Sequence, residues 1–246
     1  MQLTEHVYLV GSGALGFDLT DPFDCHVYLI DGRTELALID AGAGIDPNAI
    51  VANITAHGFA LDRVRTILLT HAHADHSGGA AALHERLGAL VAASPRAAGY
   101  VRRGDEAAIS LPAAREAGIY PAAYRFTACP VERELREGDE IHIGTLRLTV
   151  LETPGHSADH LAFLMQGAQQ ILFAGDAIFH GGKLLLQYIP DCSIWECGRT
   201  IERLSRLRID ALLPGHLSIS LHGAARHIAA ARTRLATLAV PHSIND

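Results

Sequence analysis

The chain's most informative segment is His71-Ala72-His73-Ala74-Asp75-His76, which places three imidazoles and one carboxylate within six residues. A fully apolar run, Thr66 to Thr70, comes directly before it. We therefore expect the cluster to stand at the C-terminal end of a buried strand. Ala72 and Ala74 are small enough for the loop to curl tightly. The polar side chains can then face two neighbouring points, which suits two metal ions better than one.

Three later positions extend this pattern, each at the end of a predicted strand: Thr153-Pro154-Gly155-His156, Ala174-Gly175-Asp176 and Leu213-Pro214-Gly215-His216. Each is weak support alone, because an aspartate at a strand end is often a turn residue and a Gly-His pair is common by chance. All three follow the first cluster along the chain. Together they favour a metal centre built from distant parts of the sequence.

Composition narrows the class of function. The chain has 246 residues, of which 49% are hydrophobic, and a formal net charge of −7. This length can bury a sizeable core without disulfide bonds. The 20 Lys and Arg residues are outnumbered by 27 Asp and Glu, which argues against nucleic acid as a partner. The 15 histidines, beside only four cysteines, point to imidazole chemistry.

Cysteine usage and hydropathy predict the compartment. No two of the four cysteines have C-x-x-C spacing, so we expect free, mostly buried thiols in a reducing cytoplasm. The N-terminus has no basic region, and no uninterrupted run of about 18 apolar residues occurs. The sequence therefore predicts a cytoplasmic protein with neither a signal peptide nor a membrane span.

The order of apolar runs predicts a single domain over residues 1–246. Leu36–Gly42 resembles Ile171–Asp176, since each is an apolar strand that ends near an aspartate, and this echo suggests two similar halves. Patterns at helical spacing predict a helix over Trp195–Leu207 and a final one over His222–Leu238. No linker rich in proline, serine or charge separates the halves.

Residues 95–125 are alanine-rich and predict a helical, lid-like insertion broken at Pro112 and Pro121. Its aromatic residues, among them Tyr120 and Tyr124, are expected to form an apolar wall over the metals. The same stretch equally suits a contact in a homodimer.

At this point the chain resembles a known family. The series His-x-His-x-Asp-His, Pro-Gly-His, Gly-Asp and Pro-Gly-His, in order from His71 to His216, is similar to that of the metallo-β-lactamase-fold hydrolases. The resemblance covers about residues 5–235. It implies an α/β fold, namely an αββα sandwich of two mixed β-sheets with helices on both outer faces, and a two-metal site along one edge.

Carried over residue by residue, the resemblance implies that His71, His73 and His156 hold the first metal ion. Asp75, His76 and His216 would hold the second ion, and Asp176 would bridge the two. All seven positions have the expected residue types. Imidazole and carboxylate ligands without thiolate suit two Zn²⁺ ions, and also iron or manganese.

This site implies a hydrolase. Two close cations lower the pKa of a water that they share, and hydroxide then attacks a carbonyl-type bond. Asp75 is expected to act as the catalytic general acid and base. Asp40 is a candidate acceptor for an imidazole N–H, with a role in forming the turn as the alternative.

The expected substrate is a lactone or other carboxylic ester of a small to medium, partly hydrophobic molecule. Asp176 argues against a true β-lactamase, because members that open β-lactams typically have another residue there. A glyoxalase II-like thioesterase, a phosphodiesterase and, less favoured, a β-lactamase remain alternatives, as does a non-catalytic metal-binding protein. Arg226, Arg232 and Arg234 suit the solvated face of the last helix better than a glutathione site. Lactonases have a tyrosine near the metals, which makes Tyr188 a candidate substrate-binding residue, together with His180.

Overall fold

The computed structural model describes residues 1–237, which form two compact units. The first unit comprises Met1–Leu135 and Ile143–Thr145. The second comprises Arg136–His142 and the chain from Leu146 onward. The single domain expected over residues 1–246 stays a prediction.

The first unit is built on a six-stranded mixed sheet in the order β1-β2-β3-β4-β5-β6. Strands β1 to β3 pair antiparallel, whereas β3 to β6 pair parallel. Every residue of β2 and β3 is buried, as their continuous apolar runs require. The strands are β1 (Val7–Gly11), β2 (Val27–Asp31), β3 (Leu36–Ile39), β4 (Val64–Leu68), β5 (Leu90–Ala93) and β6 (Arg133–Glu134).

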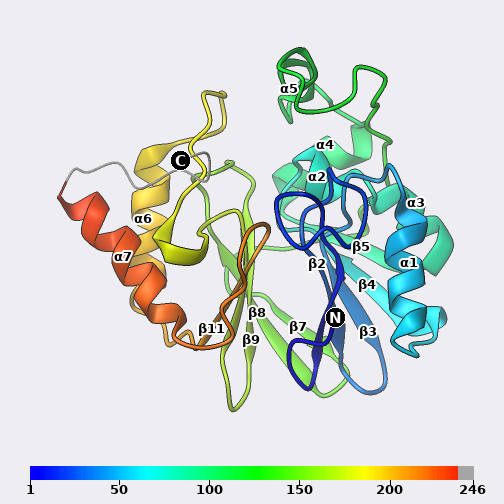
Figure 1. The fold of residues 1–246 in the computed structure, drawn as a ribbon, viewed down its shortest axis with the longest axis horizontal. Coiled ribbons are helices and arrows are strands. Elements are labelled where there is room, and N and C mark those ends of the chain that lie inside the picture. Colours follow the sequence, from blue (N-terminus) through cyan, green and yellow to red (C-terminus); the bar gives the residue numbers. More distant parts are fainter. Residues whose placement is uncertain (238–246) are drawn as a thin grey trace. The chain divides into compact units, whose positions relative to one another are not determined.

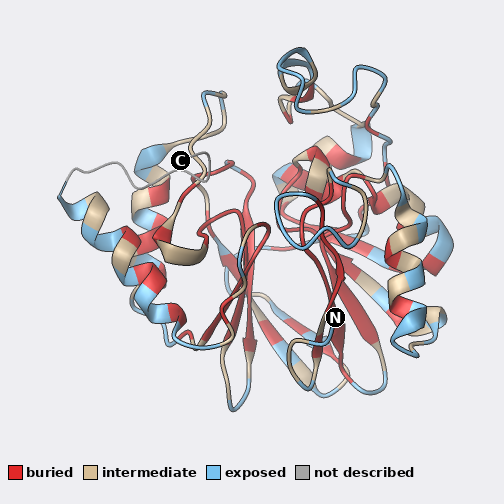
Figure 2. Cartoon of the chain, viewed as in Figure 1, coloured by how far each residue is buried: buried red, intermediate tan, exposed pale blue. Residues whose placement is uncertain are grey.

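Helices α1 and α3 run along this sheet, and their buried positions face it (Figures 1 and 2). Helix α1 begins where the Asp46 side chain accepts from Asn48 N and Pro47 occupies the first turn. Helix α3 ends at Gly88, whose φ of 62° is left-handed. The helices of this unit are α1 (Pro47–Ala56), the 3₁₀ helix η1 (Leu61–Arg63), α2 (Ala74–Ser77), α3 (Ala80–Leu87), α4 (Pro95–Arg103) and α5 (Leu111–Glu116).

The second unit has a five-stranded mixed sheet in the order β11-β10-β9-β8-β7. Helices α6 and α7 lie side by side along it (Figure 1). Its strands are β7 (Glu140–Ile143), β8 (Leu146–Glu152), β9 (Leu161–Gln166), β10 (Ile171–Gly175) and β11 (Ala211–Pro214). Its helices are η2 (His180–Gly182), α6 (Ile194–Leu204) and α7 (Ala224–Ala236).

Strands β3 and β10 hold equivalent places in their sheets. Each pairs antiparallel with the strand before it in the chain and parallel with the strand after it. Each is also followed at once by an aspartate, Asp40 or Asp176. The echo between the two halves of the sequence is therefore present in the topology.

Some expected boundaries were wrong. Pro112 does not break a helix: it is the second residue of α5, in the first turn, where its missing N–H removes no helical hydrogen bond. Helix α6 ends at Leu204 rather than Leu207. Helix α7 begins at Ala224 rather than His222, and the expected end at Leu238 lies outside the described residues.

The four cysteines are free thiols, and Cys25, Cys129 and Cys197 are buried, as expected. Across residues 1–237, no helix combines the length and the apolarity needed to cross a lipid bilayer.

Candidate metal centre

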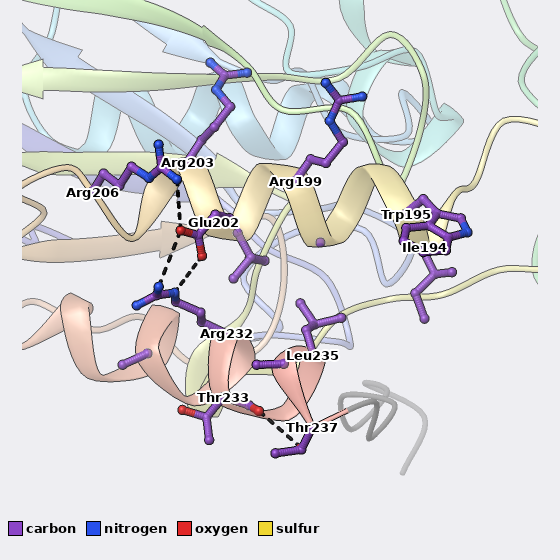
Figure 3. Close-up of a pocket in the computed structure, with 14 residues that line it drawn as sticks. Ile194, Trp195, Arg199, Glu202, Arg203, Arg206, Arg232, Thr233, Leu235 and Thr237 are labelled. Carbon is purple, nitrogen blue, oxygen red and sulfur yellow. Dashed lines mark hydrogen bonds and ion pairs between the residues drawn. The ribbon is translucent and has the colours of Figure 1, made fainter.

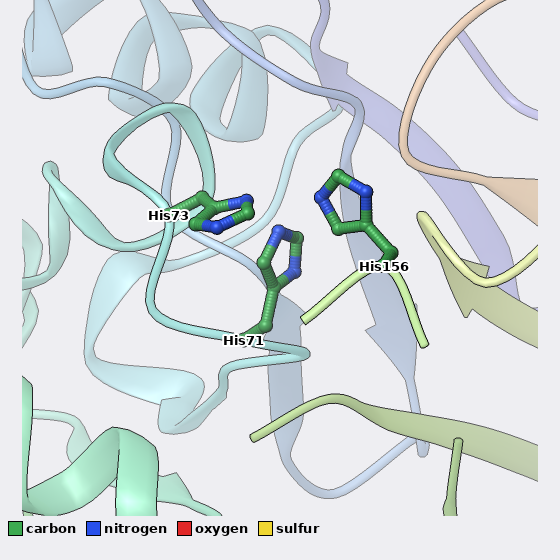
Figure 4. Close-up of side chains that lie close together, drawn as sticks. All are labelled: His71, His73 and His156. Atoms are coloured by element: carbon green, nitrogen blue, oxygen red, sulfur yellow. The ribbon is translucent and has the colours of Figure 1, made fainter. Parts of the chain in front are cut away.

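The histidine cluster follows β4, as the sequence predicts, and forms a loop that turns into α2. The side chains of His71 and His73 project from this loop (Figure 4). The ring of His71 lies 4.6 Å from that of His73 and 4.1 Å from that of His76, measured between centroids. His71 and His76 are completely buried. The first unit thus gathers three imidazoles, two of them buried and His73 half-buried.

Asp40 sets the orientation of His76. Its backbone has a φ of 63°, and its Oδ2 accepts a hydrogen bond from His76 Nδ1 at 2.8 Å. Since Nδ1 carries the donated proton, Nε2 is the nitrogen that can bind a metal. The prediction that Asp40 accepts an imidazole N–H is confirmed, and the left-handed φ shows that it also forms the turn.

Thr70 connects Asp40 to His71. Its backbone N–H and its hydroxyl both donate to Asp40, at 2.7 Å and 2.9 Å. The hydroxyl oxygen lies 3.0 Å from His71 Nδ1 and accepts from it, because its own proton is already given to Asp40. Burial raises the pKa of Asp40, and the hydrogen bonds from His76 and Thr70 oppose that rise. Because His71 Nδ1 donates to Thr70, Nε2 is the nitrogen of His71 that can bind a metal.

Asp75 lies at the start of α2, with its Oδ2 3.5 Å from His76 Nε2. Its Oδ1 accepts a hydrogen bond from the Tyr120 hydroxyl at 3.1 Å. We expected Tyr120 only as part of an apolar wall, so this polar contact was missed. Burial raises the pKa of Tyr120 well above its ordinary value, and the phenol is therefore a donor at neutral pH.

Cys25 also lies near His76 and Asp40 in the first unit. Burial raises the pKa of its thiol strongly, so the thiolate that a metal requires is disfavoured. His76 Nδ1 is moreover engaged with Asp40. This group of three side chains therefore does not suit a metal ion of its own.

In the second unit, Asp176 follows β10 and stands beside two imidazoles. Its Oδ2 lies 3.6 Å from Nε2 of His156 and 3.7 Å from Nε2 of His216. All three side chains are buried. These separations exceed hydrogen-bond length. Two atoms bound tetrahedrally to one ion at about 2.0–2.2 Å stand about 3.3–3.6 Å apart. The donor types and their spacing therefore fit metal ligation.

His160 is a residue that the sequence interpretation missed. It is buried, and its Nε2 accepts a hydrogen bond from the backbone N–H of Asp176 at 3.0 Å. Its Nδ1 therefore carries the proton and donates to Thr153 Oγ1 at 2.8 Å. His160 thus fixes the backbone at Asp176. The only signal for it was a second histidine four residues after His156.

The two candidate substrate-binding residues differ in their surroundings. His180 stands at the start of η2, and its ring lies 4.3 Å from that of His227. Tyr188, between η2 and α6, is fully exposed to solvent. A role for either residue in binding a substrate remains a prediction.

A groove of about 920 Å³ runs between α6 and α7 (Figure 3). Trp195 is 82% exposed at one end of it. Arg206 and Arg232 both pair with Glu202, at 3.1 Å and 2.6 Å. Arg232 is more than half exposed, which agrees with its expected place on the solvated face of the last helix.

Comparisons with known proteins identify the family of this chain. The sequence profile of the Metallo-beta-lactamase superfamily matches residues 20–216. The chain is 28% identical over 236 residues to the acyl-coenzyme A thioesterase MBLAC2 of Gallus gallus, covering 89% of this chain and 81% of that protein. It is 29% identical over 196 residues to a hydroxyacylglutathione hydrolase of Chromohalobacter salexigens, covering 78% and 62%.

Among solved structures, a metallo-beta-lactamase from Cronobacter sakazakii superposes with a TM-score of 0.74. It is 24% identical, and the match covers 97% of this chain and 95% of that one. The expected fold class is therefore confirmed, with two mixed sheets that each pack against helices.

Proposed function

Because the chain belongs to the metallo-β-lactamase superfamily and is a metal-dependent hydrolase, we propose that it hydrolyses thioesters that join a small acyl group to a carrier thiol. The names of both relatives describe hydrolases that act on an acyl group held by a thiol. They support the thioesterase alternative over the lactone or other carboxylic ester that the sequence first favoured.

We propose that His71, His73 and His156 bind one divalent ion, that Asp75, His76 and His216 bind another, and that Asp176 bridges them. The observation that supports this most is the buried Asp176 Oδ2, which lies 3.6 Å from Nε2 of His156 and 3.7 Å from Nε2 of His216. Zinc is the proposed metal, since the donors are imidazole and carboxylate. When bound, the two ions would lower the pKa of a water and polarise the substrate carbonyl.

The chain's own residues prepare this chemistry. Asp40 and Thr70 fix the tautomers of His76 and His71, so each ring is held ready before any ligand arrives. Asp75 is proposed to take the proton from the nucleophile and to pass it towards the leaving group. A thiolate is a more stable leaving group than an alkoxide, because a thiol has a pKa of about 8.5. Hydrolysis of a thioester therefore depends less on proton transfer from Asp75 to the leaving group than hydrolysis of an ester does.

The test is a panel of substrates offered to the zinc-loaded protein: an acyl-coenzyme A, an S-acylglutathione, a lactone, a phosphodiester and a β-lactam. We expect kcat/KM for a thioester to exceed that for every other class by about 100-fold, which is close to 3 kcal/mol of transition-state stabilisation. A lactone hydrolysed faster than both thioesters would overturn the proposal and restore the first prediction.

Metal content separates the hydrolase from a protein that only binds metal. Chelation should abolish thioester hydrolysis, and added zinc should restore it. Asp176→Asn should lose both bound metal and hydrolysis, because it removes the proposed bridging charge. Two ions per chain with no turnover of any substrate class would instead favour the non-catalytic alternative.

A further inference from the structure

Two tyrosines at the end of the insertion reach the segment around α2. The Tyr120 hydroxyl donates to Asp75 Oδ1 at 3.1 Å, and the Tyr124 hydroxyl donates to the carbonyl of Ala43 at 2.7 Å. Their rings are stacked, with centroids 5.1 Å apart and planes at 18°. One phenol therefore binds a proposed ligand, while its neighbour binds only backbone.

Partly buried polar contacts hold the loop that carries these rings. Arg115, in α5, pairs with Glu106 at 2.7 Å and donates to the carbonyl of Tyr124 at 2.9 Å. The other oxygen of Glu106 accepts from the backbone N–H of Phe126 at 2.9 Å. The end of the turn, at Tyr124 and Phe126, is thus tied to Arg115 in α5 and to Glu106 before that helix. Tyr120 is accordingly presented to Asp75 from a braced segment.

The two oxygens of the Asp75 carboxylate consequently have different neighbours. Its Oδ1 is held by the phenol, and its Oδ2 is the oxygen beside His76 Nε2. A carboxylate with one oxygen fixed by a hydrogen bond can rotate only by breaking that bond. Only the other oxygen is then directed towards an ion shared with His76.

We propose that Tyr120 is a positioning residue that holds Asp75 so that Oδ2 alone serves as its metal-ligating oxygen. The inference rests on the metal centre proposed above. The inference also assigns a role to the insertion at residues 95–125, which places the Tyr120 hydroxyl against the Asp75 carboxylate.

The test is the affinity of each metal ion, measured by titrating metal-free protein with zinc in a calorimeter and with Co²⁺ in an absorption spectrum. Tyr120→Phe keeps the stacked ring and removes only the hydroxyl. We expect this variant to lower the affinity for the ion that Asp75 binds by about 10- to 100-fold, which is the usual effect of losing a hydrogen-bond partner of a metal ligand. The other ion should keep its affinity within about threefold.

Tyr124→Phe is the matched control, because it removes from the same stack a hydroxyl that bonds only backbone carbonyls, those of Ala43 at 2.7 Å and Ala74 at 3.4 Å. It should leave both affinities unchanged. The inference is overturned if Tyr120→Phe leaves both affinities unchanged, or if both variants weaken binding equally, since the loop's stability would then be the cause. A wild-type chain that binds fewer than two ions would overturn the metal centre as well.

Discussion

Asp40 accepts the Nδ1 proton of His76 at 2.8 Å while its own backbone stands in the left-handed region, with a φ of 63°. That conformation costs a residue other than glycine about 1 kcal/mol. The cost is offset by the hydrogen bonds from Thr70 and His76, which need the carboxylate in this place. The conformation of the turn after β3 is therefore explained by the hydrogen bond that Asp40 accepts from His76.

Asp40→Asn should separate the charge of this residue from its role in the turn. Asparagine tolerates the left-handed region well, so the backbone should remain in place. The carboxylate that orients His76 is lost, and we expect zinc affinity to fall by about 10- to 100-fold. Metal titration of the purified variant measures this effect. Asp62→Asn, at an exposed position in η1, is the control and should bind zinc like wild type.

The proposed ligand residues could be singled out from the sequence because each follows an apolar strand and belongs to a short motif. Their supporting residues could not. Tyr120 meets Asp75 across 45 positions of sequence, through a loop whose path depends on Arg115 and Glu106. No local pattern encodes such a path. His160 could not be predicted for another reason. Its sequence spacing from Asp176 matches no motif, so nothing in the sequence indicates that the two residues are hydrogen-bond partners.

The fold was predictable where periodicity was strong and less so at helix ends. Strands β3 and β10 are continuous apolar runs, and a fully buried strand requires such runs. Pro112 misled because proline breaks a helix interior but suits its first turn. Pro112 lies in a first turn because α5 begins directly after Ser110, whose φ of 57° is left-handed.

His227 should make the stability of the protein fall in acid. Its Nδ1 accepts from the backbone N–H of Gly181 at 2.9 Å, and its Nε2 contacts Ser220 Oγ at 3.0 Å. Burial, followed by the nearby charges of His180 and Arg226, lowers the pKa of His227 to about 4. Protonation would also turn Nδ1 into a donor facing the Gly181 N–H.

The sign of this effect follows from the two pKa values. Between pH 6.5, the ordinary value, and about pH 4, the unfolded chain binds a proton that the folded chain refuses. The free energy of unfolding should therefore drop over this range, by about 3 kcal/mol in total. In His227→Gln that portion of the drop should vanish, whereas the exposed His222→Gln should follow wild type. Urea denaturation of metal-free protein at several pH values decides; parallel curves for all three proteins would contradict the prediction.

Gly155 should be indispensable to the turn that bears His156. Its φ is 146°, and a Cβ there would lie 2.6 Å from both the backbone nitrogen and the Sγ of Cys197 in α6. The Gly155 carbonyl also accepts from the N–H of Ser193, the residue that caps α6. The turn and the start of the helix are therefore packed backbone to backbone.

Gly155→Ala should destabilise the protein by about 3 kcal/mol, because strain and overpacking add. Gly198→Ala is a matched control in α6 itself, since nothing lies within 4 Å of a Cβ at that position. It should stabilise by up to about 1 kcal/mol, through better helix propensity. Urea denaturation measures both changes. Equal and small effects, within about 0.5 kcal/mol, would mean that α6 can retreat from the turn. Because His156 is the next residue, Gly155→Ala should also weaken zinc binding, whereas Gly198→Ala should not.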